Sequence, residues 1–349
     1  MPVSALRVAL AGYGLAGEVL HAPLVAAEPG LELATVVTSD LGRAARVRDR
    51  YPGVTVAGSF AEVGPGHDLA VVAAPNRAHV ELGLAALARG MHAVVDKPLA
   101  ALPADGRALD AAAQERGLML AVFHNRRFDG DFLTVRRLLA DGALGDVRRF
   151  ESRFERWRPT PREDAWRERG DHAEAGGVLF DLGSHLIDQA LLLFGPVDAV
   201  YAELDRRRAG VEVDDDAFVA LTHVSGVRSH LWMSQVAAQA GPRMRVLGSR
   251  AAYVKRGLDA QEDDLRAGRS PADPAWGSEP PERWGRLGDA DHATAVPTEP
   301  GSYPSFYRGV VQAIREGTAP PTGAAAAIAG LEVIQAARAS AKTGQVVKV

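Results

Sequence analysis

The chain has 349 residues, of which 47% are hydrophobic and 24% charged, with a formal net charge of −4. This length predicts two globular domains, and the small negative charge without a long basic run argues against nucleic-acid and anionic-membrane partners. The absence of cysteine excludes disulfides, thiolate nucleophiles and cysteine-ligated zinc.

The N-terminal residues lead directly into an apolar strand, without a charged leader or an isolated apolar segment. We therefore expect no signal peptide. No apolar run is long enough to span a bilayer, so the cytoplasm is the expected location.

The first predicted strand runs into Gly12-Tyr13-Gly14-Leu15-Ala16-Gly17, and a helix-like segment follows. Strand, glycines and helix in this order predict a dinucleotide-binding turn with the pattern G-x-G-x-x-G. Gly12 permits the sharp turn, Gly14 lets a pyrophosphate approach the backbone, and Gly17 lets the helix pack closely. The free N–H groups of the helix start, Leu15 among them, favour a diphosphate. The alternative is a tight turn that binds no ligand.

Strand and helix signals alternate through the first third of the chain, which predicts a doubly wound parallel sheet. The predicted strands are 6–11, 31–38, 68–74, 92–95 and 118–123, and the predicted helices are 15–27, 43–51, 78–89 and 103–116. We therefore assign residues 1–123 to a dinucleotide-binding Rossmann domain, and the fold class is α/β.

After about residue 124 most strands follow one another without a helix between them, which predicts an α+β domain over 124–349 with a large, mostly antiparallel sheet. The predicted strands are 147–154, 197–204, 217–222, 227–233, 243–247 and 345–349, and the predicted helices are 128–141, 181–194, 305–316 and 324–341. Residues 256–303 are rich in proline, glycine and charge, so we expect little regular structure there.

Asp96-Lys97-Pro98 follows the predicted strand 92–95. Ligands of an open parallel sheet bind beyond the carboxyl ends of its strands, so Lys97 is expected to face the cofactor cleft. Its ammonium can hold a substrate oxygen and stabilise negative charge that grows there, or transfer a proton if desolvated. The alternative is a solvated loop lysine beside a turn-forming proline.

Asp181, His185 and Asp188 stand at i, i+4 and i+7, beside an apolar stripe of the same predicted helix. A neighbouring carboxylate raises the proton affinity of an imidazole and fixes its orientation. This pair suits a general base that takes a hydroxyl proton while hydride leaves the same carbon. The alternative is that Asp181 caps the helix and His185 is a surface histidine.

The end of the second predicted strand bears on cofactor choice. A carboxylate at the strand tip holds the ribose hydroxyls of NAD, whereas a nearby arginine accommodates the 2′-phosphate of NADP. If Arg43 lies early in the next helix, the tip falls at Thr38 or Ser39, whose small side chains leave room for phosphate. This favours NADP. The alternative is that Asp40 reaches back to the ribose, which favours NAD.

Two weaker candidate groups also follow strands. Pro75, Asn76 and His79 are candidate contacts of the nicotinamide end, or else form a turn and a helix cap. Asn125 and Arg126 are candidate substrate ligands, although the arginines at 126 and 127 could equally make ion pairs between domains.

Asp171-His172-Ala173-Glu174 has the residue types of a metal site. No second histidine stands at i+4, and no ordered ligand set accompanies the run. We therefore expect no metal.

Together these residues resemble the Gfo/Idh/MocA family of nicotinamide-dependent oxidoreductases, over essentially the whole chain. The resemblance rests on the glycine turn, on Asp96-Lys97-Pro98 where the family has Glu-Lys-Pro, and on Gly177-x-x-x-Asp181-x-Gly183-x-His185-x-x-Asp188. It implies that Lys97, Asp181 and His185 are catalytic and contact the substrate. Asp96 replaces the family's glutamate and shortens the carboxylate arm that is expected near the nicotinamide ribose.

Residues 12–23 and 122–132 are similar to the NADP-dependent scyllo-inositol dehydrogenase branch of this family. The resemblance implies an NADP-preferring dehydrogenase, with NAD possible, that moves hydride between nicotinamide and a secondary alcohol or ketone of a cyclic polyol or sugar. It also implies that the open C-terminal sheet forms homodimers or homotetramers. The alternatives are a non-catalytic NADP-binding sensor or regulator on the same scaffold, and a reductase of a non-sugar substrate such as biliverdin or an imine.

Overall fold

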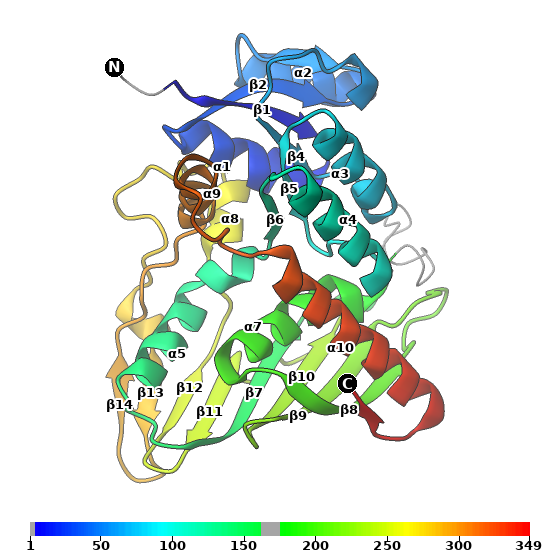
Figure 1. Cartoon of the computed structure of the whole chain (residues 1–349). Helices are drawn as coiled ribbons and strands as arrows, with labels where there is room; N and C mark the ends of the chain where they lie inside the picture. Colours follow the sequence, from blue (N-terminus) through cyan, green and yellow to red (C-terminus); the bar gives the residue numbers. More distant parts are fainter. Residues whose placement is uncertain (1–3, 162–174) are drawn as a thin grey trace. The chain divides into compact units, whose positions relative to one another are not determined.

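A computed structural model describes residues 4–161 and 175–349, which form two compact units (Figure 1). Unit 1 comprises Met1–Asn125, Gln261–Trp276 and Ser302–Ile328. Unit 2 comprises Arg126–Ala260, Gly277–Gly301 and Ala329–Val349. The domain boundary after residue 123 stays a prediction, and the units show in addition that two late segments pack with the N-terminal part of the chain.

Unit 1 is built on a six-stranded parallel sheet in the order β3-β2-β1-β4-β5-β6. The strands are β1 (Leu6–Ala11), β2 (Leu31–Val37), β3 (Thr55–Ala57), β4 (Leu69–Val72), β5 (His92–Asp96) and β6 (Leu120–Phe123). Strand β4 in the interior of the sheet and strand β6 at its edge are both buried throughout, as expected of a parallel sheet covered on both faces. The predicted Rossmann fold is confirmed.

The helices of unit 1 come from both ends of the chain. They are η1 (Ala16–His21), α1 (Ala22–Ala27), α2 (Leu41–Arg50), α3 (His79–Ala88), α4 (Pro103–Glu115), α8 (Gln261–Arg266) and α9 (Pro304–Glu316), with short 3₁₀ turns η2 (Phe60–Glu62) and η3 (Asn76–Ala78). Helix α9 lies against α1, and its Arg315 donates a 2.8 Å hydrogen bond to the carbonyl of Ser4. The C-terminal part of the chain therefore completes the N-terminal unit.

Unit 2 contains a nine-stranded sheet in the order β14-β13-β12-β11-β7-β10-β9-β8-β15. The strands are β7 (Val147–Glu155), β8 (Val197–Asp205), β9 (Asp216–His223), β10 (Arg228–Ser234), β11 (Met244–Gly248), β12 (Ala252–Lys255), β13 (Gly285–Gly288), β14 (Ala293–Val296) and β15 (Val347–Lys348). Neighbouring strands are antiparallel except β7 and β10, which are parallel. The prediction of a large, mostly antiparallel sheet is confirmed.

One face of this sheet carries helices, whereas the other, the open face, carries none among the described residues (Figure 1). Helices α5 (Gly130–Ala140), α7 (Ser184–Phe194) and α10 (Ala324–Thr343) lie over the first face, with η6 (Leu179–Gly183) leading into α7 (Figure 1). Buried and partly exposed residues alternate along β9, as this arrangement requires. On the open face Phe218 and Trp232 stand opposite each other, and the guanidinium of Arg153 lies 3.9 Å from the Trp232 ring centroid.

The prediction of little regular structure between residues 256 and 303 is wrong, because α8, η7 (Pro281–Arg283), β13 and β14 lie there. The two strands are only four residues long, and β13 consists of two glycines, an arginine and a leucine, so neither strand gives a clear pattern of apolar alternation. Gly288 in the hairpin has φ +152°, and a Cβ on it would lie 2.0 Å from the carbonyl oxygen of His292. Pairing with β12, rather than local propensity, accounts for these strands.

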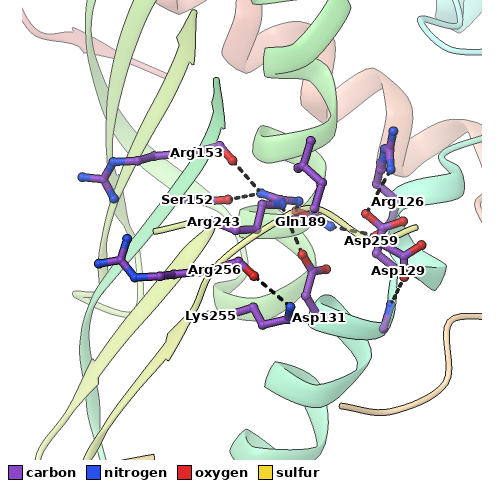
Figure 2. A network of polar contacts seen from close by, with 12 residues as sticks. Arg126, Asp129, Asp131, Ser152, Arg153, Gln189, Arg243, Lys255, Arg256 and Asp259 are labelled. Carbon is purple, nitrogen blue, oxygen red and sulfur yellow. Dashed lines mark hydrogen bonds and ion pairs between the residues drawn. The ribbon is translucent and has the colours of Figure 1, made fainter. Parts of the chain in front are cut away.

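A buried polar network ties the helices of unit 2 to its sheet (Figure 2). The guanidinium of Arg243 lies 3.2 Å from Asp131 of α5 and donates hydrogen bonds to Ser152 of β7 (2.7 Å) and to Gln189 of α7 (3.1 Å). The Gln189 amide in turn donates a 2.7 Å hydrogen bond to the Arg126 carbonyl. Because these side chains are buried, the network fixes α5 and α7 against the sheet.

Replacing Arg243 by Met should lower the free energy of unfolding by about 3–5 kcal/mol, since Asp131 would stay buried without its cation. Urea denaturation measures the change. Arg245→Met is the matched control, because the Arg245 side chain is 41% exposed and its ion pair with Glu151 is worth at most about 1 kcal/mol. An equal decrease in the free energy of unfolding in both variants would contradict a larger contribution of the buried Arg243–Asp131 pair.

Candidate active site

The parallel strands of unit 1 end at one edge of the sheet, and the predicted cofactor residues follow these ends. Gly12 follows β1, Thr38 follows β2, Pro75 lies beyond β4, and Lys97 follows β5. Asn125, which is buried, lies beyond β6. This edge is where open α/β sheets bind ligands.

The three glycines of the first turn have different steric surroundings. Gly12 has φ +106°, and a Cβ on it would lie 2.6 Å from the carbonyl oxygen of Ala73. A Cβ on Gly17 would lie 2.1 Å from the carbonyl oxygen of Gly12. Around Gly14, in contrast, no atom of the described residues other than its chain neighbours lies within 4 Å of the Cβ position, and the neighbouring Leu15 is exposed. The turn is thus closed by backbone packing on two sides and open at Gly14, which fits the approach of a diphosphate.

The loop after β2 presents small side chains and an arginine. Thr38 is partly exposed, Ser39 is exposed, and Arg43 is the third residue of α2 and exposed. Asp40 caps this helix, because its Oδ1 accepts a 2.8 Å hydrogen bond from the Arg43 N–H. This hydrogen bond, with the nearby arginines, holds the pKa of the Asp40 carboxyl below its usual value. The Asp40 carboxylate is therefore held at the helix start.

Lys97 is half-buried directly after β5, and its peptide bond to Pro98 is cis. The preceding Asp96 is buried, and its Oδ1 accepts a 2.9 Å hydrogen bond from the Lys97 N–H. The same oxygen faces His21 Nε2 at 3.7 Å, an ion-pair distance rather than a hydrogen bond. Burial opposes ionisation of Asp96, but the contact with His21 and the charges of His79 and Lys97 keep its pKa below the usual value. The short carboxylate arm thus points into unit 1.

Residues 75–79 divide between surface and interior. Pro75 is exposed and Asn76 partly exposed, whereas His79 is buried. The ring nitrogens of His79 lie 2.8 Å from the Pro98 carbonyl oxygen and 2.9 Å from that of Ala74. Burial lowers the pKa of His79, against the opposing charge of Asp96. His79 therefore joins the turn after β4 to the turn after β5, and its predicted contact with the cofactor stays a prediction.

In unit 2 the motif that runs from Gly177 to Asp188 begins at a tight contact that was not predicted from the sequence. Gly177 has φ +93°, and a Cβ on it would lie 2.2 Å from Oδ1 of Asp214. Asp214 Oδ2 accepts a 2.8 Å hydrogen bond from the Leu179 N–H at the start of η6. Asp214 thus positions the π-helical segment that carries Asp181, and such segments are frequent at functional sites. The only sequence signal was the run of three aspartates at 214–216.

Asp181, His185 and Asp188 lie in different environments. Asp181 is partly exposed in η6, whereas His185 and Asp188 of α7 are buried. Arg127 binds Asp188 with two hydrogen bonds of 2.6 and 2.8 Å. Asp188 is therefore part of a structural ion pair, and Asp181 and His185 remain the candidate catalytic groups of unit 2.

Arg126 has structural contacts within unit 2. Its guanidinium lies 3.5 Å from Asp129 and 5.2 Å from the Phe154 ring centroid. Burial, opposed by Arg126 and supported by the nearby carboxylates of Asp259 and Asp131, raises the pKa of Asp129 well above its usual value. The predicted substrate contact of Arg126 stays a prediction.

Among residues 4–161 and 175–349, no three His, Asp or Glu side chains form a group that could hold a metal ion. The run at 171–174 lies outside the described residues. Within the same described ranges, no helix has the length and apolar character needed to span a membrane.

Comparisons with known proteins show the family to which the chain belongs. The family model "Oxidoreductase family, NAD-binding Rossmann fold" matches residues 6–124, and the model "GFO/IDH/MocA C-terminal domain" matches residues 132–254. The chain is 36% identical to scyllo-inositol 2-dehydrogenase (NADP(+)) IolW of Bacillus subtilis, over 97% of this chain and 95% of the relative. It is 40% identical to the oxidoreductase YdgJ of Escherichia coli, over 97% and 96%.

The structure of yvaA from Bacillus subtilis superposes on this chain with a TM-score of 0.94 at 35% sequence identity. The superposition covers 100% of this chain and 99% of that one.

Proposed function

The chain belongs to the Gfo/Idh/MocA family of oxidoreductases, and from this premise we propose that it is an NADP-preferring dehydrogenase of a cyclic polyol or sugar. It oxidises a secondary alcohol of an inositol-like substrate, or reduces the ketone in reverse. The observation that carries the proposal is Lys97 at the carboxyl end of β5, on the sheet edge where the glycine turn lies. A relative that is 36% identical acts on scyllo-inositol with NADP, which supports the substrate class.

The glycine turn and the loop after β2 are suited to NADP, which supplies the hydride acceptor when bound. The open space at Gly14 admits the diphosphate, and Thr38, Ser39 and Arg43 receive the 2′-phosphate. The hydrogen bond that holds the Asp40 carboxylate at the start of α2 supports NADP over NAD, since that carboxylate is the candidate ribose ligand.

Three side chains carry the chemistry in this proposal. Lys97 holds the reacting oxygen and stabilises the charge that develops on it. His185 accepts the hydroxyl proton as general base. Asp181 orients the imidazole and favours its protonated form.

We also propose that the enzyme is a homodimer or homotetramer that associates through the open face of the nine-stranded sheet. Phe218, His230 and Trp232 lie partly exposed on that face. Arg153 stacks on Trp232 there, and aromatic residues with arginine are enriched in protein interfaces.

A screen of polyols and sugars with NADP and NAD, followed by absorbance of the reduced cofactor, tests the function. Turnover of an inositol or sugar with NADP is expected. Cofactor binding without turnover over the whole panel would instead indicate a sensor or regulator.

Lys97→Met should reduce kcat by a factor on the order of 10²–10³ and leave NADPH binding nearly unchanged, because one donor to the developing oxyanion is lost. Steady-state kinetics and fluorescence titration of NADPH measure the two effects. Lys342→Met, at an exposed position of α10, is the control. Activity of Lys97→Met within about threefold of the native enzyme would refute the catalytic role.

His185→Asn should lower kcat and remove a limb of the pH–rate profile, because asparagine keeps some hydrogen bonding but cannot accept a proton at neutral pH. The profile of kcat between acidic and alkaline pH measures this. His292→Asn, at an exposed loop position, should leave the profile as it is. If His185→Asn retains both the rate and the limb, another group is the base.

Arg43→Ala should weaken NADP binding about tenfold to a hundredfold, because a charge-assisted contact with the 2′-phosphate is worth about 1.5–3 kcal/mol. NAD affinity should hardly change. Thr38→Asp should shift the preference further toward NAD by placing a carboxylate where the phosphate binds.

Titration of both cofactors against these variants and against Arg48→Ala, an exposed position farther along α2, measures the effect. Tighter NAD binding by the native protein, with equal effects of Arg43→Ala on both cofactors, would assign the ribose to Asp40.

A further inference from the structure

Next to Lys97, unit 1 contains a series of buried polar side chains that come from three distant parts of the sequence. Asp96 ends β5, His21 ends η1, and Tyr307 lies on α9. All three side chains are buried, His21 and Tyr307 completely. None of them belongs to the dinucleotide-binding turn or to the groups proposed above for proton transfer.

The contacts link Tyr307 to His21, His21 to Asp96, and Asp96 to the backbone of Lys97. The Tyr307 hydroxyl lies 2.6 Å from Nδ1 of His21, and Nε2 of the same ring faces Asp96 Oδ1 at 3.7 Å. Asp96 Oδ1 in turn accepts the hydrogen bond from the Lys97 N–H. The backbone of Lys97 is thus linked through a carboxylate and an imidazole to a phenol that lies 286 residues from His21 in the sequence.

The hydrogen-bonding roles of the three groups are mutually consistent. Burial, with a contribution from Asp96, raises the pKa of Tyr307 well above its usual value, so the hydroxyl keeps its proton. The Asp96 carboxylate favours an N–H at the ring nitrogen that faces it, Nε2. With the N–H on Nε2, Nδ1 can accept the 2.6 Å hydrogen bond from the Tyr307 hydroxyl.

Aromatic packing fixes the ring between its two partners. The His21 and Phe123 ring centroids are 4.3 Å apart, and Phe123 packs edge-on against Phe306 at 4.9 Å. Both phenylalanines are completely buried. The packing therefore holds the ring in the orientation that turns Nε2 toward Asp96 and Nδ1 toward Tyr307.

We propose that Tyr307 and His21 are positioning residues for Lys97: the hydroxyl orients the imidazole, the imidazole holds the Asp96 carboxylate, and the carboxylate fixes the main chain from which the lysine side chain starts. The kinetic consequence rests on the proposed function of Lys97, whereas the structural consequence does not. The arrangement also gives the shortened carboxylate arm of Asp96 a place inside the fold.

Lysine-selective ¹⁵N labelling tests the structural part directly. The sequence has four lysines, at positions 97, 255, 342 and 348, so the labelled protein gives four backbone amide resonances. The spectrum of Lys97→Arg identifies the one from Lys97. Tyr307→Phe and His21→Gln should each move the Lys97 resonance more than those of the other three lysines. Because the hydroxyl acts through the ring, the double variant should move it no further than His21→Gln alone.

Tyr253→Phe is the matched control, since it removes the hydroxyl of another completely buried tyrosine, in unit 2. It should leave the Lys97 resonance in place. If Tyr307→Phe does not fold, His21→Gln gives the same readout. A Lys97 resonance that stays in place in the folded variants overturns the proposal.

Kinetics separates positioning from a merely structural role. Tyr307→Phe should lower kcat about tenfold to a hundredfold, the size of effect expected for a small misplacement of a catalytic group. The KM and dissociation constant for NADP should be unchanged, because the glycine turn and the loop after β2 are untouched. If the native protein turns over no polyol or sugar, the proposed function fails, and the Lys97 resonance still decides the positioning role. An unchanged kcat in an active, folded Tyr307→Phe enzyme refutes it.

Discussion

Charges that leave water need partners, and this requirement shapes the elements that carry the candidate catalytic groups. In unit 2, Arg243 contacts both Asp131 of α5 and Gln189 of α7. Arg127 forms an ion pair with Asp188, which lies one turn after His185. In unit 1, the buried Asp96 carboxylate accepts a hydrogen bond from the Lys97 N–H and lies 3.7 Å from Nε2 of His21. Each candidate catalytic residue therefore lies on a segment whose position is set by a neighbouring buried charge.

Local patterns predicted most of the fold and part of the site. The glycine spacing gave the turn after β1, and the alternation of strands with helices gave the parallel sheet, because both signals lie within short stretches of sequence. The position of Lys97 at the ligand-binding edge followed from the rule that open parallel sheets bind ligands beyond the carboxyl ends of their strands. Contacts between remote residues could not be predicted in this way. No periodicity connects His21 with Tyr307, or Gly177 with the Asp214 carboxylate that excludes any larger residue there.

The loop after β2 shows how one residue type can support opposite interpretations. An aspartate just beyond the second strand is a candidate ribose ligand, and here it stands one residue before a helix. At that position its carboxylate accepts a hydrogen bond from the Arg43 N–H, and this contact is the main reason why the pKa of the Asp40 carboxyl lies below its usual value. Spacing relative to the helix start, rather than residue identity, decides which interaction the carboxylate makes.

Helix α9 has a consequence for how the protein is made. It belongs to unit 1 but lies near the C-terminus of the chain, so it is synthesised late. Its Tyr307 contacts His21 of η1, and both η1 and β5 are synthesised early. At ribosomal elongation rates the delay between them is on the order of ten seconds or more. During that interval the nascent N-terminal part has the strands and the glycine turn of a nucleotide-binding unit, but His21 and Asp96 lack the hydroxyl and the helix that enclose them. A fragment that ends at residue 125 lacks α9, and we therefore expect it to leave the His21 ring without its Tyr307 partner.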